Sequence, residues 1–139
     1  MSDEAISLTN RDRERLVQMI EELSLLNDPD TVRRLQMLKT ELERAATTPS
    51  EKTAPDVVTM NSRIRFKDTD TGEELVYTVT WPEFADAEEH KVSVLAPIGM
   101  ALLGTKVGQI IEWDVPAGKR HFRVEEILYQ PEASGDYDG

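Results

Sequence analysis

The chain has 139 residues, no cysteine and a formal net charge of -11, from 27 acidic and 16 basic side chains. This length suits one ordinary domain, or a small domain with an appendage, and it allows a core without metals or disulfides. The absence of cysteine excludes disulfides, thiol catalysis and cysteine-ligated metal sites. The negative charge argues against direct binding to a nucleic-acid backbone or to an anionic membrane surface.

The acidity is concentrated in the second part of the chain. Residues 56–139 carry 16 acidic and 8 basic groups, whereas residues 1–55 carry 11 and 8. Residues 1–4 are acidic where a signal peptide would be basic, and no apolar run approaches the roughly 20 residues of a membrane span. We therefore expect a cytoplasmic protein.

The first 46 residues predict two amphipathic helices. Thr9 is suited to cap the first helix, and Asp28 followed by Pro29 is typical of the start of the second. Apolar residues recur at helical spacing in both segments: Leu16, Ile20 and Leu23, then Leu35, Leu38, Leu42 and Ala45. The segments form a short antiparallel hairpin, a coiled coil, with helices of about 17 residues or about 25 Å. Helices this short need support from the second domain or from a partner.

Residues 47–55 predict a linker, because they are rich in Thr, Ser and Pro and contain no large apolar side chain. From residue 57 the hydrophobic period changes from 3.6 to 2, which indicates strands. We expect a short helix at Pro97–Leu103 and strands at residues 63–67, 75–81, 92–94, 110–115 and 119–129. Several antiparallel strands with one short helix predict an α+β domain over residues 56–139.

No pattern in the sequence predicts a catalytic constellation. Residues 99–106 superficially match a phosphate-binding loop, but the lysine and hydroxyl residues stand in reversed order. Residues 68–72 match part of a calcium loop, but the glycine comes one place early and no distal glutamate follows. His90 and His121 lack a paired-ligand spacing, and no nucleophile motif occurs. We therefore predict no catalytic residue, no metal site and no cofactor.

Asp28 and Asp30 lie at the expected tip of the hairpin and allow two interpretations. Two carboxylates at the end of a helical rod suit a magnesium ion that is delivered into the active site of another protein. In the simpler interpretation, which we favour, Asp28 caps the second helix and Asp30 complements its dipole.

Two segments resemble the signatures of a known family. Residues 96–108, which read APIGMALLGTKVG, closely resemble a signature of the bacterial GreA/GreB transcript-cleavage factors. Residues 115–120 (VPAGKR), followed by Phe122 and residues 124–127 (VEEI), resemble a second signature of that family. The resemblance is specific over residues 56–137 and only architectural over residues 1–46.

The overall length and two further segments resemble one short branch of this family. These segments are residues 56–62 (DVVTMNS) and 129–137 (YQPEASGDY). The branch is named for regulation of nucleoside diphosphate kinase. No surface predicted from the sequence suggests direct contact with that kinase, so an indirect effect through transcription is an equal alternative.

The resemblance implies an FKBP-like C-terminal domain that carries an N-terminal coiled coil. In Gre factors, the globular domain docks on RNA polymerase at the rim of the secondary channel, and the coiled coil enters that channel. The docking loop of the family centres on a Ser-Pro pair, which corresponds here to Ala96 and Pro97. We therefore expect a polymerase-docking loop at Ala96, Pro97, Ile98 and Gly99, in which Ala96 lacks the hydroxyl of the family's serine.

The hairpin tip departs further from the family pattern. Gre factors present an acidic residue and a glutamate at the tip, which recruit magnesium for cleavage of backtracked RNA, whereas residues 27–31 read NDPDT. The helices also look about half as long as in Gre factors. Losing 15 residues per helix withdraws the tip by about 22 Å, whereas a metal ligand must lie within about 2 Å of its ion. We predict polymerase binding without transcript cleavage.

Two other functions remain as alternatives. The first is a weak Gre-type cleavage factor that uses Asp28 and Asp30. The second is an FKBP-type prolyl isomerase, which needs an aromatic-lined pocket, although Tyr77, Trp81, Trp113 and Phe122 are equally well interpreted as packing residues.

Overall fold

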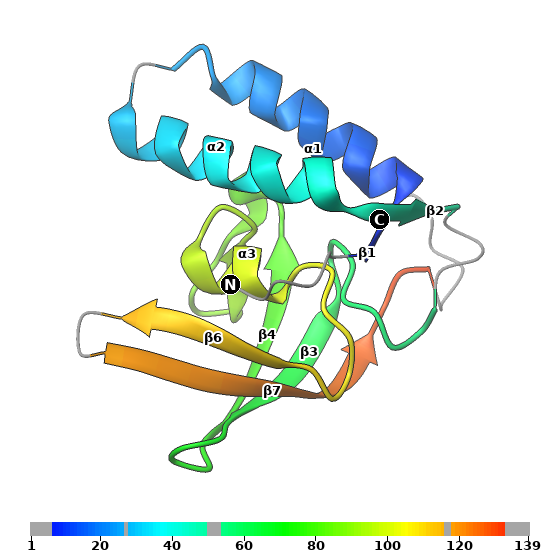
Figure 1. Ribbon diagram of the computed structural model, residues 1–139, viewed down its shortest axis with the longest axis vertical. Helices are drawn as coiled ribbons and strands as arrows, with labels where there is room; N and C mark the ends of the chain where they lie inside the picture. The colour runs from blue at the N-terminus through cyan, green and yellow to red at the C-terminus, as the bar shows by residue number, and fades with distance from the viewer. Residues whose placement is uncertain (1–6, 27, 50–53, 116–117, 133–139) are drawn as a thin grey trace.

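The computed structural model describes residues 7–26, 28–49, 54–115 and 118–132. In these residues, two helices form a hairpin with a two-stranded sheet at its base, and a five-stranded sheet with a short α-helix forms most of the remainder. Figure 1 shows the two long helices side by side across one end, with the short helix between them and the sheet.

The two predicted helices are present, and their first residues are capped as expected. Helix α1 (Asn10–Leu23) is capped by the Thr9 hydroxyl, which accepts the Asp12 amide at 2.9 Å. Helix α2 (Pro29–Arg44) is capped by Asp28, with Pro29 in the first turn. With 14 and 16 residues, both helices are slightly shorter than the predicted length of about 17.

A small parallel sheet connects the hairpin to the rest of the molecule. It consists of β1 (Ser7–Thr9) and β2 (Ala46–Thr48), which pair over three residues. The Ser7 amide also donates to the Gly104 carbonyl at 3.2 Å. Thr47 and Thr48, which were expected in the linker, therefore belong to a strand. Their β-branched side chains suit a strand, but one alanine and two threonines produce no recognisable alternation.

The main sheet contains β3 (Arg63–Asp68), β4 (Glu74–Thr80), β5 (Lys91–Ser93), β6 (Ile110–Val115) and β7 (Gly118–Tyr129), in the order β5-β4-β3-β7-β6. Strand β3 is antiparallel to both β4 and β7, and β6 is antiparallel to β7. The α+β fold class and the positions of these strands are confirmed.

The predicted antiparallel pairing does not extend to one edge of the sheet, where β5 runs parallel to β4. A parallel neighbour requires a crossover rather than a hairpin turn. Residues 81–90 supply it through the 3₁₀ helix η2 (Pro82–Phe84) and the turn that follows. Pro82 has no amide hydrogen to continue the ladder, so it ends the pairing of β4 and begins this crossover.

Helix α3 (Pro97–Leu102) covers one face of the sheet. Its C-terminal end is followed by Gly104, whose φ of 79° favours glycine. An added Cβ on Gly99 would lie 2.1 Å from the Ser93 carbonyl oxygen, so the backbone of α3 packs directly on β5.

The helices and the sheet share one hydrophobic core. Leu16, Leu35, Leu38 and Leu42 are buried in the same cluster as residues of the sheet and of α3. The hairpin thus packs on the β domain, which is one of the two kinds of support that its short helices were expected to use. Buried residues extend from the base of the hairpin to Leu16 in α1 and Leu35 in α2, and Leu23 at the end of α1 also packs against the core. Most of the hairpin therefore lies against the body, and its exposed leucines are Leu25 and Leu26 beyond α1. Within the described ranges, no helix is long and apolar enough to span a membrane.

Candidate functional site

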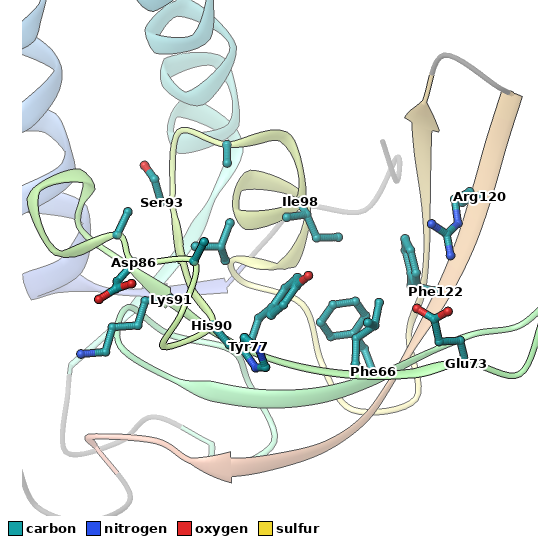
Figure 2. A pocket seen from close by; sticks show the side chains of 15 residues that line it. Phe66, Glu73, Tyr77, Asp86, His90, Lys91, Ser93, Ile98, Arg120 and Phe122 are labelled. Atoms are coloured by element: carbon teal, nitrogen blue, oxygen red, sulfur yellow. The ribbon is translucent and has the colours of Figure 1, made fainter.

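A cleft of about 730 Å³ opens beside the start of α3. Its floor is formed by the sheet and its wall by Ala96 and Ile98. Figure 2 shows Ile98 above the rings of Phe66 and Tyr77, with Arg120 towards one end and Lys91 towards the other. The predicted docking loop is therefore part of a larger concave surface.

Three aromatic rings from β3, β4 and β7 form the floor of the cleft. The Phe66 and Phe122 rings meet edge to face with centroids 5.3 Å apart, and the Phe66 and Tyr77 centroids lie 5.6 Å apart. Phe66 and Phe122 are fully buried, whereas Tyr77 is partly exposed. Edge-to-face pairs add to the stabilisation from burial, so the rings of this floor support one another.

One end of the cleft is closed by an ion pair between Arg120 and the buried Asp68. Arg120 Nε donates to Asp68 Oδ2 at 2.8 Å, and its guanidinium lies 5.1 Å from the centroid of the Phe122 ring. Asp68 Oδ1 also accepts the amides of Asp70 and Thr71 at 2.8 and 3.1 Å. The Arg120 guanidinium lowers the pKa of Asp68. The pattern at residues 68–72 is therefore a turn that anchors an arginine.

The other end is formed by the edge strand β5 and the crossover before it. His90 adopts a left-handed backbone conformation with φ of 56°, and its ring meets that of Tyr77 with centroids 6.0 Å apart. The backbones of Asp86 and Lys91 exchange two hydrogen bonds, of 3.0 and 2.9 Å. These bonds fix the crossover against β5 and shape the entrance to the cleft.

The structure separates the four predicted docking residues into two pairs. Pro97 is exposed and Ala96 is half-buried, so both are accessible at the surface. Ile98 is 6% exposed and lines the cleft, whereas Gly99 is buried against the Ser93 carbonyl. The first pair is therefore at the surface, and the second pair packs beneath it.

The tip carboxylates are exposed and already have partners. Asp28 Oδ2 accepts from the Thr31 hydroxyl at 2.5 Å and from its amide at 3.3 Å, and these bonds lower the pKa of Asp28. Asp30 forms an ion pair with Arg33, with 3.4 Å between Asp30 Oδ1 and Arg33 Nη2. Among the described residues, no group of three or more His, Cys, Asp or Glu side chains is arranged to hold a metal. The tip also exposes Leu25 and Leu26, by 83% and 52%.

The sequence analysis did not predict the aromatic cleft, although the signal was present. Tyr77 pairs with Ile64, and Phe122 pairs with Asp68. Directly paired residues share a face of the sheet, so recognition of this pairing would have placed the rings together. Tyr77 and Phe122, interpreted as packing residues, do pack: Phe122 is fully buried beneath the cleft, whereas Tyr77 is partly exposed to it.

Comparisons with known proteins support the resemblance. A family model described as "Transcription elongation factor, GreA/GreB, C-term" matches residues 52–129. The chain is 39% identical to the "Regulator of nucleoside diphosphate kinase" (Rnk) of Escherichia coli strain K12 over 138 residues, which cover 99% of this chain and 98% of that protein.

Two further relatives connect the chain to elongation factors. It is 32% identical to "Transcription elongation factor GreA" of Pelobacter propionicus over 97 residues, which cover 70% of this chain and 61% of that protein. A solved structure, "Prokaryotic transcription elongation factor GreA/GreB from Nitrosomonas europaea", is 37% identical with a TM-score of 0.73. That match covers 91% of this chain and 100% of the other. Both the predicted family and the two-part architecture are confirmed.

Proposed function

Because the chain belongs to the GreA/GreB family of transcription elongation factors, we propose that it docks on RNA polymerase at the rim of the secondary channel and does not stimulate transcript cleavage. Members of this family are regulatory factors that bind RNA polymerase. In this proposal, the chain leaves its short hairpin at the channel entrance and competes with longer factors for the same site.

The aromatic cleft beside Pro97 is the observation that supports docking most directly. An exposed proline at the edge of a well-packed apolar concavity suits a protruding protein segment. Little conformational entropy is lost when such a surface is covered by a partner. Aromatic residues are also enriched at the centres of protein interfaces. Ala96 contributes only a methyl group here, so the expected contact is made through shape and apolar area.

The tip supports the absence of cleavage. Asp28 is engaged as a helix cap, Asp30 pairs with Arg33, and the neighbouring Leu25 and Leu26 are apolar. Helix α2 has 16 residues, which gives a length of about 24 Å. A metal-delivering tip is expected to present unengaged carboxylates on a long rod, whereas Asp28 and Asp30 each bond a neighbouring side chain at the end of a short hairpin, which supports the proposal.

Binding of core RNA polymerase to wild-type protein and to Pro97→Ala tests the docking proposal. The dissociation constant is expected to rise at least tenfold in Pro97→Ala. The matched control is Pro55→Ala, an exposed proline that does not line the cleft, which is expected to bind like the wild type. Equal affinity of all three proteins, or no binding by the wild type, would contradict the proposal.

The aromatic cleft also favours one alternative, prolyl isomerisation, because that chemistry uses an aromatic-lined pocket. A protease-coupled peptide assay distinguishes the two functions. We expect no rate above background, because Arg120 and Asp68 are committed to each other and the described residues offer no catalytic constellation. A rate abolished by Tyr77→Ala would support the isomerase instead.

The relative's name refers to regulation of nucleoside diphosphate kinase. We assign any such effect in this protein to transcription rather than to contact with the kinase. Measuring kinase activity with purified proteins tests this assignment, and a change in activity without polymerase would contradict it.

A further inference from the structure

A buried carboxylate joins the base of the helical hairpin to the β domain. Asp12 lies in the first turn of α1 and is only 3% exposed. Its Oδ2 accepts the backbone amide of Met60 at 3.0 Å, across 48 residues of sequence. Met60 precedes β3, so this bond connects two parts of the chain that meet only in the folded molecule.

The groups that face Asp12 provide little positive charge. Within α1, Arg15 is the facing cation, and its guanidinium lies 4.4 Å from the centre of the Trp81 ring. From the C-terminal segment, Glu132 faces Asp12 with a second carboxylate, and Glu132 Oε1 accepts the Thr59 hydroxyl at 2.6 Å. The contacts from β1 and from the segment before β3 are the Thr9 hydroxyl and the Met60 amide.

This environment favours the protonated form of Asp12. Removing a carboxylate from water is costly unless its charge is balanced, and a second carboxylate increases the cost. The protonated group keeps its bond to the Met60 amide, because its carbonyl oxygen still accepts. Protonation therefore removes the electrostatic cost without removing the connection.

We propose that Asp12 is a proton-operated latch, which tightens the attachment of the helical hairpin to the β domain when it is protonated and loosens that attachment when it ionises. The latch controls how often the hairpin opens from the domain. It therefore controls the fraction of time in which the hairpin tip is held in one orientation relative to the β domain. It does not depend on polymerase binding, so the proposed function and the latch can fail separately.

Opening of the hairpin is expected to change with pH just below neutrality. Burial raises the pKa of Asp12 from 3.8 to about 6, the Met60 amide opposes the rise, and the charge of Glu132 adds to it. In an opened hairpin the carboxyl returns to water and to its ordinary value. Because the pKa of Asp12 is higher in the closed hairpin than in the opened one, the equilibrium constant for closing the hairpin is about tenfold larger at pH 5 than at pH 7.5.

Native-state hydrogen exchange of the backbone amides of α1 tests the latch. After correction for intrinsic exchange rates, protection of these amides is expected to rise about tenfold from pH 7.5 to pH 5. The amides of α1 are expected to be less protected than those of β3 at pH 7.5, because the hairpin opens before the whole protein unfolds.

Three variants make the result specific to Asp12. In Asp12→Asn, the backbone amides of α1 are expected to be highly protected at both pH values, without the tenfold change. Glu132→Gln is expected to move the response to lower pH, and it provides a test if Asp12→Asn fails to fold. Glu14→Gln, an exposed acid on the same helix, is the matched control and should behave like the wild type.

Two results would overturn the latch. One is an unchanged pH response in both Asp12→Asn and Glu132→Gln. The other is equal protection of α1 and β3 amides at every pH, because the hairpin would then open only when the whole protein unfolds.

Discussion

Position 99 accepts only glycine, because an added Cβ would lie 2.1 Å from the Ser93 carbonyl oxygen. Gly99→Ala must push α3 away from β5, and overpacking of this kind costs about 1–3 kcal/mol. We expect a loss of that size or larger in the free energy of unfolding, measured by urea denaturation. Pro97→Ala, at an exposed position two residues earlier, should unfold within about 0.5 kcal/mol of the wild type. Equal stability of Gly99→Ala and wild type would contradict the close packing.

The pair of Asp68 and Arg120 makes stability depend on pH in the acid range. Arg120 lowers the pKa of Asp68 in the folded state. The stabilisation is therefore complete above the ordinary value of 3.8 and is lost as the pH falls through the lowered folded value. Arg120→Met should lower the urea midpoint at pH 7, and the difference from wild type should shrink below pH 3.8. A difference that is constant with pH would show that the pair does not cause it.

Helix α2 attaches the hairpin to the shared core through one apolar stripe. Leu38 is 1% exposed, whereas its neighbour Met37 is 48% exposed. Leu38→Ala leaves a cavity between the hairpin and the domain, and such substitutions cost about 2–5 kcal/mol. Met37→Ala, the matched control, should change the free energy of unfolding by less than about 0.5 kcal/mol. Similar losses in both variants would mean that the stripe does not hold the hairpin.

The elements that sequence reasoning predicted are those with strong local signals. Thr9, Asp28 and Pro29 mark helix starts through local hydrogen bonds and backbone geometry, and the structure places the caps there. Strand β3 alternates in burial over its six residues and β7 alternates in its middle, and β4 is seven residues long with β-branched and aromatic side chains. The direction of β5 and the pairing of β2 with β1 depend on contacts between distant segments, and three residues contain too little pattern to reveal them.

The candidate site also consists of a part that one continuous segment predicts and a part that depends on segments far apart in the sequence. The motif that contains Ala96 and Pro97 was recognisable in the sequence, and the structure places both residues at the surface. The cleft beside them was not recognisable, because it requires Phe66, Tyr77 and Phe122 from three strands in one register. Only the pairing of the strands brings these rings together.

At the scale of the whole molecule, the chain combines a β domain with a short hairpin that packs on it. Leu16 and Leu35 are buried in the shared core and Leu23 packs against it, so little of the hairpin extends beyond the body. The chain spans 61% of the Pelobacter propionicus GreA protein that it matches. A hairpin without a long free rod is the arrangement that the proposed role requires, which is to occupy a shared site and block it.

The most direct test of this account uses one backtracked RNA polymerase complex. The protein is titrated into the complex with and without a fixed amount of a Gre factor, and transcript length is measured over time. Alone, it is predicted to leave transcripts uncut, and in the mixture it should slow Gre-stimulated cleavage in proportion to its concentration, whereas Pro97→Ala should not. Transcripts shortened by the protein alone, or Gre-stimulated cleavage that it never slows, would contradict the account.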